Sequence, residues 1–274
     1  MNNNVIDYSK IDIKNNLMFC TVMKNPELCR QFLERVLNIS IKEIRYVHSE
    51  KNIDIAIKSK SIRLDVYAND DKGTIYNIEM QNASSTEIPK RSRYYSSLID
   101  LDFLHKGQSY RFLPQSIILF ICDFDLFPPY NQPIYCFENR CTDNNKLSLN
   151  DGTMKAFVNI KGDLGKVSNQ LKSLLQYFDT GKVSDEFTAT LDNEVNSTRN
   201  NKKWRLEYMT LQDALNEKYE LGCEKGIEIG RGEGIKIGEQ RLSTLVRLLL
   251  ADERFEEIRC LPENQDKLYE EYRI

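Results

Sequence analysis

The hydrophobic period of the chain changes twice within its first 125 residues, and the order of these changes constrains the fold more than any other feature. Apolar residues at positions 28, 32, 33, 36 and 37 follow Asn25 and Pro26 at helical spacing. This pattern predicts an amphipathic helix with an N-cap and a proline in its first turn. From about Ile44 the period becomes two: isoleucines at 53, 55 and 57 alternate with polar residues, and residues 63–68 and 75–81 flank a turn. Three consecutive antiparallel strands are therefore expected.

The helical period returns after Pro89, over residues 90–104, and a continuous apolar run over 115–123 follows it. Such a run is typical of a strand that is covered on both faces. The predicted order is αβββαβ, which defines an α/β fold with a mixed sheet flanked by helices. Further strands are expected at 134–137 and 155–160, and helices at about 171–181 and 204–221.

Six of the twelve glycines fall between positions 222 and 238, and five of them recur every fourth residue. A period of four on a helix of 3.6 residues per turn keeps these glycines on one slowly drifting stripe, where a second helix could approach closely. We therefore expect a domain over 1–221, a helical extension over 222–274, and a homo-oligomer contact through 222–238. The alternative is a flexible hinge, because each interior glycine costs a helix roughly 0.5–1 kcal/mol. A phosphate-binding loop would need a GxxxxGK[ST] pattern, which the sequence lacks.

Composition excludes several functional classes. The 38 Lys and Arg against 41 Asp and Glu give a net charge of −3, so no strong basic field indicates nucleic acid. Eight of the acids fall within residues 252–271, however, which leaves the rest of the chain close to neutral. With only two histidines, multi-histidine zinc sites and histidine-based catalysis are disfavoured, so carboxylates should carry any catalysis.

The cysteines and the apolar runs predict where the protein works. Seven cysteines without a CxxC pair favour a reduced, cytoplasmic protein, and Cys136 and Cys141 are expected to be buried small hydrophobic residues rather than metal ligands. Apolar runs are far shorter than the ~20 residues of a membrane-spanning helix, so no membrane partner is expected.

Two acids stand out on the second and third predicted strands. A hairpin centred on Lys72 places Asp65 opposite Glu79 and Arg63 opposite Gln81, and opposed residues lie roughly 4.5–5.5 Å apart at Cβ. Two facing carboxylates repel each other unless a cation lies between them, and hard oxygen ligands suit Mg²⁺. The alternative is a pair of solvated strand acids bridged by Arg63.

Several short motifs, in this order, extend beyond these two acids. They are Asn16-Leu17-Met18-Phe19, Arg63-Leu64-Asp65-Val66-Tyr67, Ile78-Glu79-Met80-Gln81, Lys90-Arg91-Ser92-Arg93-Tyr94-Tyr95, Lys106-Gly107 with Tyr110, Phe120-Ile121-Cys122-Asp123-Phe124-Asp125, Leu149-Asn150-Asp151-Gly152, Glu207-Tyr208-Met209 and the glycine repeat. With these motifs the chain resembles the recombination-promoting nucleases (Rpn), also called PD-(D/E)XK nuclease family transposases. The resemblance covers nearly the whole chain and implies a restriction-endonuclease-like core, which the αβββαβ order independently predicts.

The resemblance also implies a reaction, the Mg²⁺-dependent hydrolysis of DNA phosphodiester bonds by an endonuclease linked to recombination or mobile elements. Asp65 and Glu79 match the two acids of the motif and, with the backbone carbonyl of Met80, would hold Mg²⁺ or another divalent cation. Gln81 stands where the motif name has Lys, so it would orient the attacking water while the metal lowers that water's pKa. Leu64 replaces the motif's Pro.

Other residues are weaker candidates for the same chemistry. Glu34, on the polar side of helix 26–37, is a candidate additional acid, with an ordinary solvated helix face as the alternative. Arg93, with Lys90 and Arg91, is expected to contact DNA phosphates, and a structural ion pair with a core acid is the alternative for Arg93. The tyrosines at 94 and 95 are expected in the core rather than stacked on bases.

A second class of function stays open from the sequence. A chain of this kind could keep the nuclease fold as a catalytically weak or inactive DNA-binding or oligomeric interaction module. Gln81 does not by itself favour this alternative, because the family that the chain resembles usually carries Gln at this position.

Overall fold

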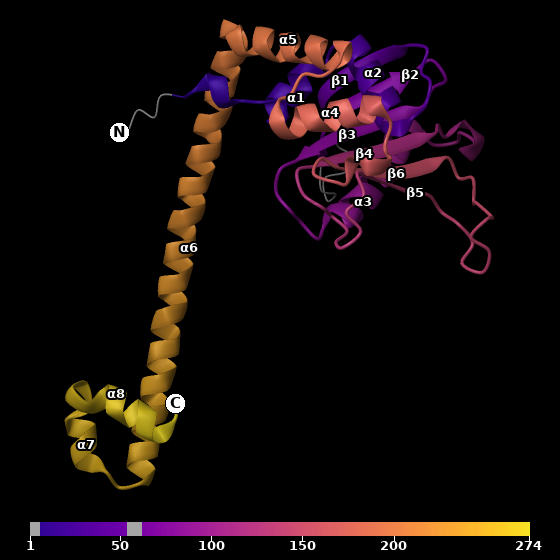
Figure 1. Ribbon diagram of the computed structural model, residues 1–274. Helices are drawn as coiled ribbons and strands as arrows, with labels where there is room; N and C mark the ends of the chain where they lie inside the picture. Colours follow the sequence, from indigo (N-terminus) through magenta and orange to yellow (C-terminus); the bar gives the residue numbers. More distant parts are fainter. Residues whose placement is uncertain (1–5, 54–61) are drawn as a thin grey trace. The chain divides into compact units, whose positions relative to one another are not determined.

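A computed structural model describes residues 6–53 and 62–274. The chain divides into two compact units, Met1–Leu206 and Glu207–Ile274. The first unit is the α/β unit and the second is helical (Figure 1). The predicted boundary between residues 221 and 222 falls inside α6, Lys202–Ala251, which runs through both units.

The α/β unit is built on one mixed sheet of six strands in the order β1-β2-β3-β4-β6-β5. The strands are β1 Ile44–Ile53, β2 Ile62–Asp70, β3 Ile75–Gln81, β4 Ser116–Cys122, β5 Ile134–Phe137 and β6 Thr153–Asn159. β1, β2 and β3 are antiparallel neighbours, β4 and β6 continue parallel to β3, and β5 is antiparallel to β6. The predicted mixed sheet and its three leading antiparallel strands are therefore confirmed. Ile55 and Ile57, assigned to the first of these strands, lie outside the described residues.

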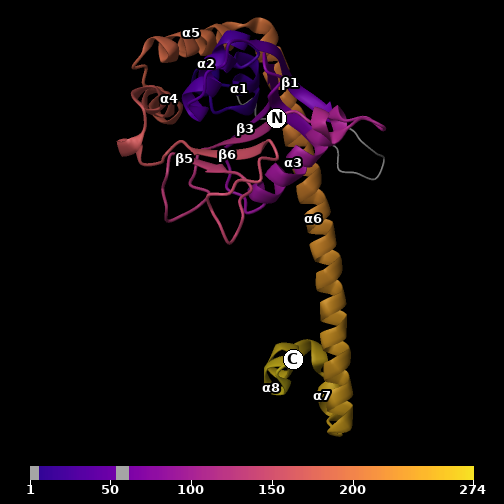
Figure 2. The same cartoon turned by 90° about the vertical axis from the view of Figure 1, so that its right-hand side faces the viewer.

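Helices cover both faces of the sheet (Figure 2). α3, Ile88–Phe103, packs on β4 and β1. On the other side lie α1 Asn16–Val22, α2 Pro26–Leu37, α4 Asn169–Thr180 and α5 Glu186–Asn200. Rings from three of these helices meet in the core, with Phe19 5.9 Å from Phe32 and Phe32 6.1 Å from Phe178, measured between ring centroids. The predicted α2 is confirmed, whereas α1 and α5 were not predicted.

The β2–β3 turn fixes the register of the central hairpin. Asp70, which is buried, accepts hydrogen bonds from the N–H groups of Lys72 and Thr74 on Oδ1, at 2.9 and 2.8 Å, and from the hydroxyl of Tyr76 on Oδ2, at 2.9 Å. Gly73 takes a φ of +83°, a conformation that L side chains rarely adopt. One buried acid therefore ties both strands to the turn, which disfavours a slip of register.

The helical unit consists of most of α6 with α7, Phe255–Arg259, and α8, Leu261–Tyr272. A small apolar cluster joins them, made of Leu245, Leu249, Leu261, Leu268 and Tyr269. The glycine repeat lies within the continuous helix α6, and a Cβ atom added at any of its glycines would meet nothing within 4 Å. Within the described ranges, no helix combines the length and apolarity needed to cross a membrane.

All seven cysteines carry free thiols. Cys136 is exposed and Cys141 partly exposed, so the expectation that both are buried small hydrophobic residues is wrong. Cys136 sits on the short edge strand β5, where successive side chains point to opposite sides of the sheet, and the strand buries Tyr135 instead.

Candidate functional site

The two acids lie where regular pairing between β2 and β3 ends. The ladder pairs Val66 with Ile78 through to Asn69 with Ile75, which confirms the register centred on Lys72 and leaves Asp65 opposite Glu79. At this level the backbone bonds to carboxylates: the Asp65 N–H donates to Glu79 Oε1 and the Met80 N–H donates to Asp65 Oδ2, each at 3.2 Å. Each acid is therefore held by the backbone of the opposite strand, and their relative placement is rigid.

Asp65 and Glu79 are two buried carboxylates whose negative charges lie close together. Glu79 is 1% exposed and Asp65 9%. Burial of Glu79, and then the charge of Asp65, raise the pKa of Glu79 well above its ordinary value. The side chain of Asn77 partly offsets this by donating to Glu79 Oε1 at 3.2 Å. The site therefore favours an added positive charge.

Asn16 is a site residue that reasoning from the sequence assigned no role. It begins α1 after the N-cap Asn15, and its Nδ2 donates to Asp65 Oδ2 at 2.7 Å. One turn later, the Cys20 thiol lies 3.4 Å from the Asp65 carbonyl oxygen and 3.5 Å from Asn16 Oδ1. Asn16 reaches Asp65 through the tertiary packing of α1, a helix of seven residues that is too short for periodicity to identify.

Arg91 is the basic residue of α3 that faces the acids. Its Nη2 lies 3.6 Å from Glu79 Oε2 and donates to the Tyr95 hydroxyl at 2.9 Å, while Nη1 donates to Gln81 Oε1 at 3.0 Å. The ion pair with a core acid that the sequence offered for Arg93 is therefore made by Arg91. Lys90 and Arg93 are exposed.

Tyr95 lies in the core, as predicted. It is 7% exposed and stacks on Phe120 with 6.0 Å between ring centroids. Burial, and then the charge of Glu79, raise its pKa above the ordinary value. Tyr94 is partly buried against the same apolar cluster, so the prediction holds for both rings.

Glu34 is engaged away from the two acids. Its Oε2 lies 2.7 Å from Arg30 Nη1, and its Oε1 accepts from the Ile41 N–H at 2.8 Å. These bonds tie α2 to the loop before β1. Arg63, the predicted partner of Gln81, lies on β2 opposite Asn52, and its side chain is outside the described part of the molecule.

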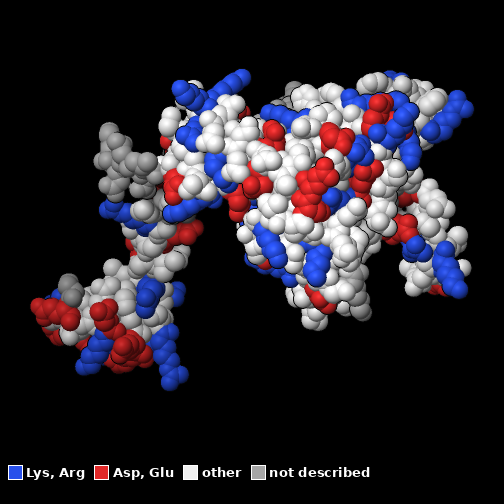
Figure 3. All heavy atoms as spheres, turned by 45° about the horizontal axis from the view of Figure 1, so that its top comes forward, with Lys and Arg blue, Asp and Glu red and all other residues white. Residues whose placement is uncertain are grey.

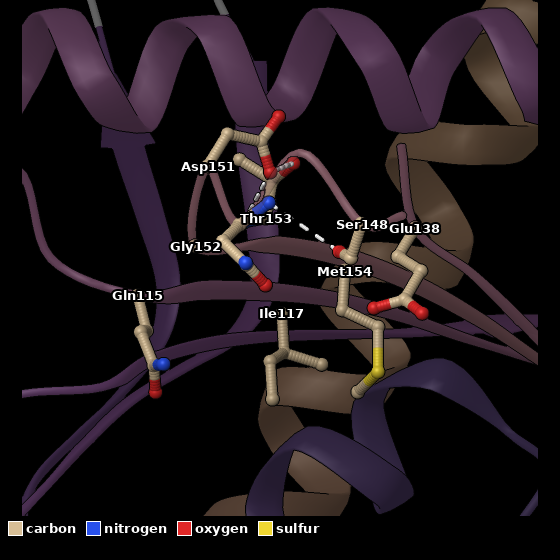
Figure 4. Close-up of a pocket in the computed structure, with 9 residues that line it drawn as sticks. Gln115, Ile117, Glu138, Ser148, Asp151, Gly152, Thr153 and Met154 are labelled. Atoms are coloured by element: carbon tan, nitrogen blue, oxygen red, sulfur yellow. Dashed lines mark hydrogen bonds between the residues drawn. The ribbon is translucent and has the colours of Figure 1, made fainter. Parts of the chain in front are cut away.

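A cavity of about 310 Å³ lies elsewhere in the α/β unit (Figure 4). It is lined by residues at the start of β4 and β6, such as Gln115, Asp151 and Thr153. The two strands run parallel, with Ser116 beside Thr153 at one end and Cys122 beside Asn159 at the other, where Gln81 also lies. This cavity therefore lies at the end of the strands opposite to Gln81, and the acid pair does not line it.

Surface charge shows no dominant sign on the face drawn in Figure 3. Lys and Arg side chains alternate with Asp and Glu side chains over the α/β unit. This view agrees with the nearly balanced charge of the chain, so any attraction of a polyanion on this face must come from local groups.

The donor set fits a hard divalent cation. Within residues 6–53 and 62–274, no group of three or more His, Cys, Asp and Glu side chains is arranged to hold a metal. Two carboxylates, with a backbone carbonyl at Met80, are nevertheless the kind of set Mg²⁺ accepts, because Mg²⁺ keeps several waters and shares substrate phosphates. Burial of Glu79 and the nearby charge of Asp65 raise the pKa of Glu79, so a cation at this site would favour its ionised form.

A mixed sheet with helices on both faces and an interlocked acid pair on its central hairpin places the protein in the nuclease-like α/β class. The family model for the PD-(D/E)XK nuclease family transposases matches residues 9–180, and the chain belongs to this family. Searches of curated proteins and of solved structures give no match. The matched segment contains the acid pair, Gln81 and Arg91, so the resemblance and the fold class expected from the sequence are confirmed.

Proposed function

We propose that the protein is a Mg²⁺-dependent DNA endonuclease of the Rpn type that acts in the cytoplasm in recombination or mobile-element biology. The observation that carries this proposal is the buried acid pair, Asp65 and Glu79, braced across the end of the β2–β3 ladder in a chain of a nuclease family. Two acids that lay on a solvent-exposed face of the sheet would be neither buried nor hydrogen-bonded to the backbone of the opposite strand.

Each residue of the site has a separate role in the proposed reaction. Asp65, Glu79 and the carbonyl of Met80 would hold the ion, which when bound lowers the pKa of a water and offsets phosphate charge. Asn16 and Asn77 fix one oxygen of each acid. Because Arg91 occupies Gln81 Oε1, Gln81 presents its Nε2 to a water or phosphate. Since Gln81 carries no charge, it orients the water and does not remove its proton.

DNA would be bound beside this site. Lys90 and Arg93 are exposed on the first turns of α3 and are suited to neutralise backbone phosphates. Arg91 contributes to the site from the inside, through Glu79 and Gln81. Glu34 is left out of this mechanism because Arg30 and the Ile41 N–H already occupy its carboxylate.

A second candidate function is a DNA-binding or oligomeric module without useful activity. The observation that favours it is Arg91, whose guanidinium group already lies 3.6 Å from Glu79. In such a module the arginine would replace the metal as the neutralising group.

Cleavage of plasmid DNA distinguishes the two functions. The wild type should cut with Mg²⁺ and not with chelator, while Asp65→Asn and Glu79→Gln should not cut, because each substitution keeps the shape and removes one charge. Asp179→Asn, at an exposed acid on α4, is the matched control and should cut like the wild type. Equal cutting by the wild type and Asp65→Asn, or none by the wild type with Mg²⁺ or Mn²⁺, contradicts the nuclease function.

We also infer that the glycine stripe 222–238 mediates homo-oligomerisation. Along this part of α6 four isoleucines are 54–72% exposed, at 227, 229, 235 and 237. An isolated helix gains little from exposing such residues, whereas a second copy could cover them, and the glycines would allow the two backbones a close approach.

A further inference from the structure

Two lysines border the end of β3 that carries Gln81, and both pair with one acid. Asp123 follows β4, and its N–H donates to the Gln81 carbonyl at 3.0 Å, which places Asp123 beside the last residue of β3. Lys14 Nζ lies 3.4 Å from Asp123 Oδ2, and Lys161 Nζ lies 3.2 Å from Asp123 Oδ1 and 3.1 Å from its carbonyl oxygen. This group carries a net charge of +1.

Lys14 is connected to the acid pair from two directions. Its carbonyl accepts from Asn82 Nδ2 at 2.8 Å, and Asn82 directly follows Gln81. Two residues after Lys14, Asn16 donates to Asp65 at 2.7 Å. The segment 14–16 therefore runs from the residue after Gln81 to Asp65, with Lys14 at the Gln81 end.

The group is held in place yet open to solvent. The side chains of Lys14 and Asp123 are 18% and 20% exposed, and that of Lys161 is 54% exposed. A lysine side chain without a partner loses conformational entropy when it binds a phosphate. Lys14 and Lys161 are already ordered by Asp123, so they lose less. The arrangement is thus ordered for an anion that approaches from the solvent side.

We propose that Lys14 and Lys161, positioned by Asp123, form a phosphate clamp at the Gln81 end of the site. This inference rests on the proposed nuclease function and names the residues that contact its substrate. The clamp supplies the positive charge that a lysine at position 81 would otherwise supply, because an ammonium group acts on phosphate as a point charge. Lys14 and Lys161 contact the phosphate, and Asp123 acts through them as a positioning residue.

Metal-free binding tests the clamp without any cleavage. Fluorescence anisotropy of a labelled DNA duplex in chelator, over a range of salt concentrations, gives the number of phosphate contacts from the slope of log K against log salt. Lys14→Gln and Lys161→Gln should each weaken binding and reduce the slope by about 1. Lys172→Gln, at an exposed lysine on α4, should match the wild type, and Lys14→Arg should restore binding and slope. Slopes of both Gln variants equal to that of Lys172→Gln overturn the clamp.

Asp123→Asn tests the positioning role. Removal of a negative charge should leave DNA affinity unchanged or higher, yet kcat with Mg²⁺ should fall by about 10-fold or more, because misplaced substrate groups lose catalysis rather than binding. An unchanged kcat contradicts the positioning role of Asp123. If the wild type binds DNA but never cleaves it, the nuclease function fails, while the metal-free slopes still decide the clamp. Thermal unfolding of every variant, followed by Trp204 fluorescence, confirms that the α/β unit is folded.

Discussion

Replacing Arg91 by methionine should destabilise the α/β unit by an amount that depends on pH. The substitution keeps much of the apolar stem and removes three polar contacts, with the Tyr95 hydroxyl at 2.9 Å, Gln81 Oε1 at 3.0 Å and Glu79 Oε2 at 3.6 Å. The two hydrogen bonds are independent of pH in the acid and neutral range. At about 1 kcal/mol each, they should contribute roughly 2 kcal/mol to the loss.

The contact with Glu79 supplies the part that varies with pH. For unit charges at this separation, Coulomb's law gives about 4.6 kcal/mol at an effective dielectric constant of 20 and about 1.2 kcal/mol at 80. Because the Arg91 side chain is 33% exposed, solvent screening favours the lower part of this range, about 1–2 kcal/mol. This loss applies only when Glu79 is ionised.

The sign follows from the raised pKa of Glu79. Burial and then the charge of Asp65 raise that pKa, so the folded state binds the proton more tightly, and stability falls as pH rises from the ordinary carboxyl pKa through the raised one. Without Arg91 the pKa rises further and the fall is larger. Arg91→Met should therefore cost about 2 kcal/mol at pH 5 and about 3–4 kcal/mol at pH 9.

Urea unfolding in chelator at the two pH values measures this difference. Trp204, the single tryptophan of the chain, is buried in the α/β unit and reports its unfolding by fluorescence. Lys90→Met, at the exposed neighbouring position, is the control and should change stability little at either pH. A difference between Arg91→Met and wild type that is the same at pH 5 and pH 9 would refute the electrostatic argument.

Two further predictions concern the rest of the molecule. Asp185 caps α5 and pairs with Arg35 at 2.5 Å; burial alone would raise its pKa, but hydrogen bonds from Arg35 and Thr188 lower it. Asp185→Ala should therefore cost about 1–2 kcal/mol at pH 7, and the cost should shrink as pH falls through the lowered pKa, as measured by Trp204 fluorescence in urea. Truncation after Leu221 should lower the number of chains per particle, obtained as the mass from light scattering divided by the mass of one chain, if the stripe 222–238 mediates association, and an unchanged number of chains would favour the hinge.

The fold could be predicted where one period dominates a segment. The helix 26–37 repeats apolar residues at helical spacing. The hairpin of β2 and β3 was predictable from the turn between its strands, although burial does not alternate along β3. α5 has the same helical spacing, with Phe187, Leu191 and Val195 four residues apart and buried, but it lies in a run rich in Thr, Asn and Asp, which weaken helix propensity. α1 spans only seven residues, too few for periodicity to identify it.

The site was predictable along the strands and less so across the helices. Strand alternation and the hairpin centre identify Asp65 and Glu79 because the side-chain period of a strand is two and the turn fixes the register. To predict Arg91 as the site residue, one must know which face of α3 packs on the sheet. At 100° per residue Arg91 lies on the same face as Tyr95, whereas Arg93 lies on another face. Asn16 reaches Asp65 only through tertiary packing of α1, which no local pattern encodes.

The groups around Asp65 and Glu79 reduce the free-energy cost of burying two neighbouring carboxylates. The ladder end supplies backbone donors to both carboxylates, and Arg91 supplies a positive charge beside Glu79. These groups lower the cost of burying two acids but do not remove it, since the pKa of Glu79 stays raised. On the Gln81 side, the two lysines already share Asp123 and cannot neutralise the acids as well. Under the proposed function, Asp65 and Glu79 would hold a divalent cation whose charge would relieve the remaining imbalance, and Lys14 and Lys161 would contact the phosphate of the substrate.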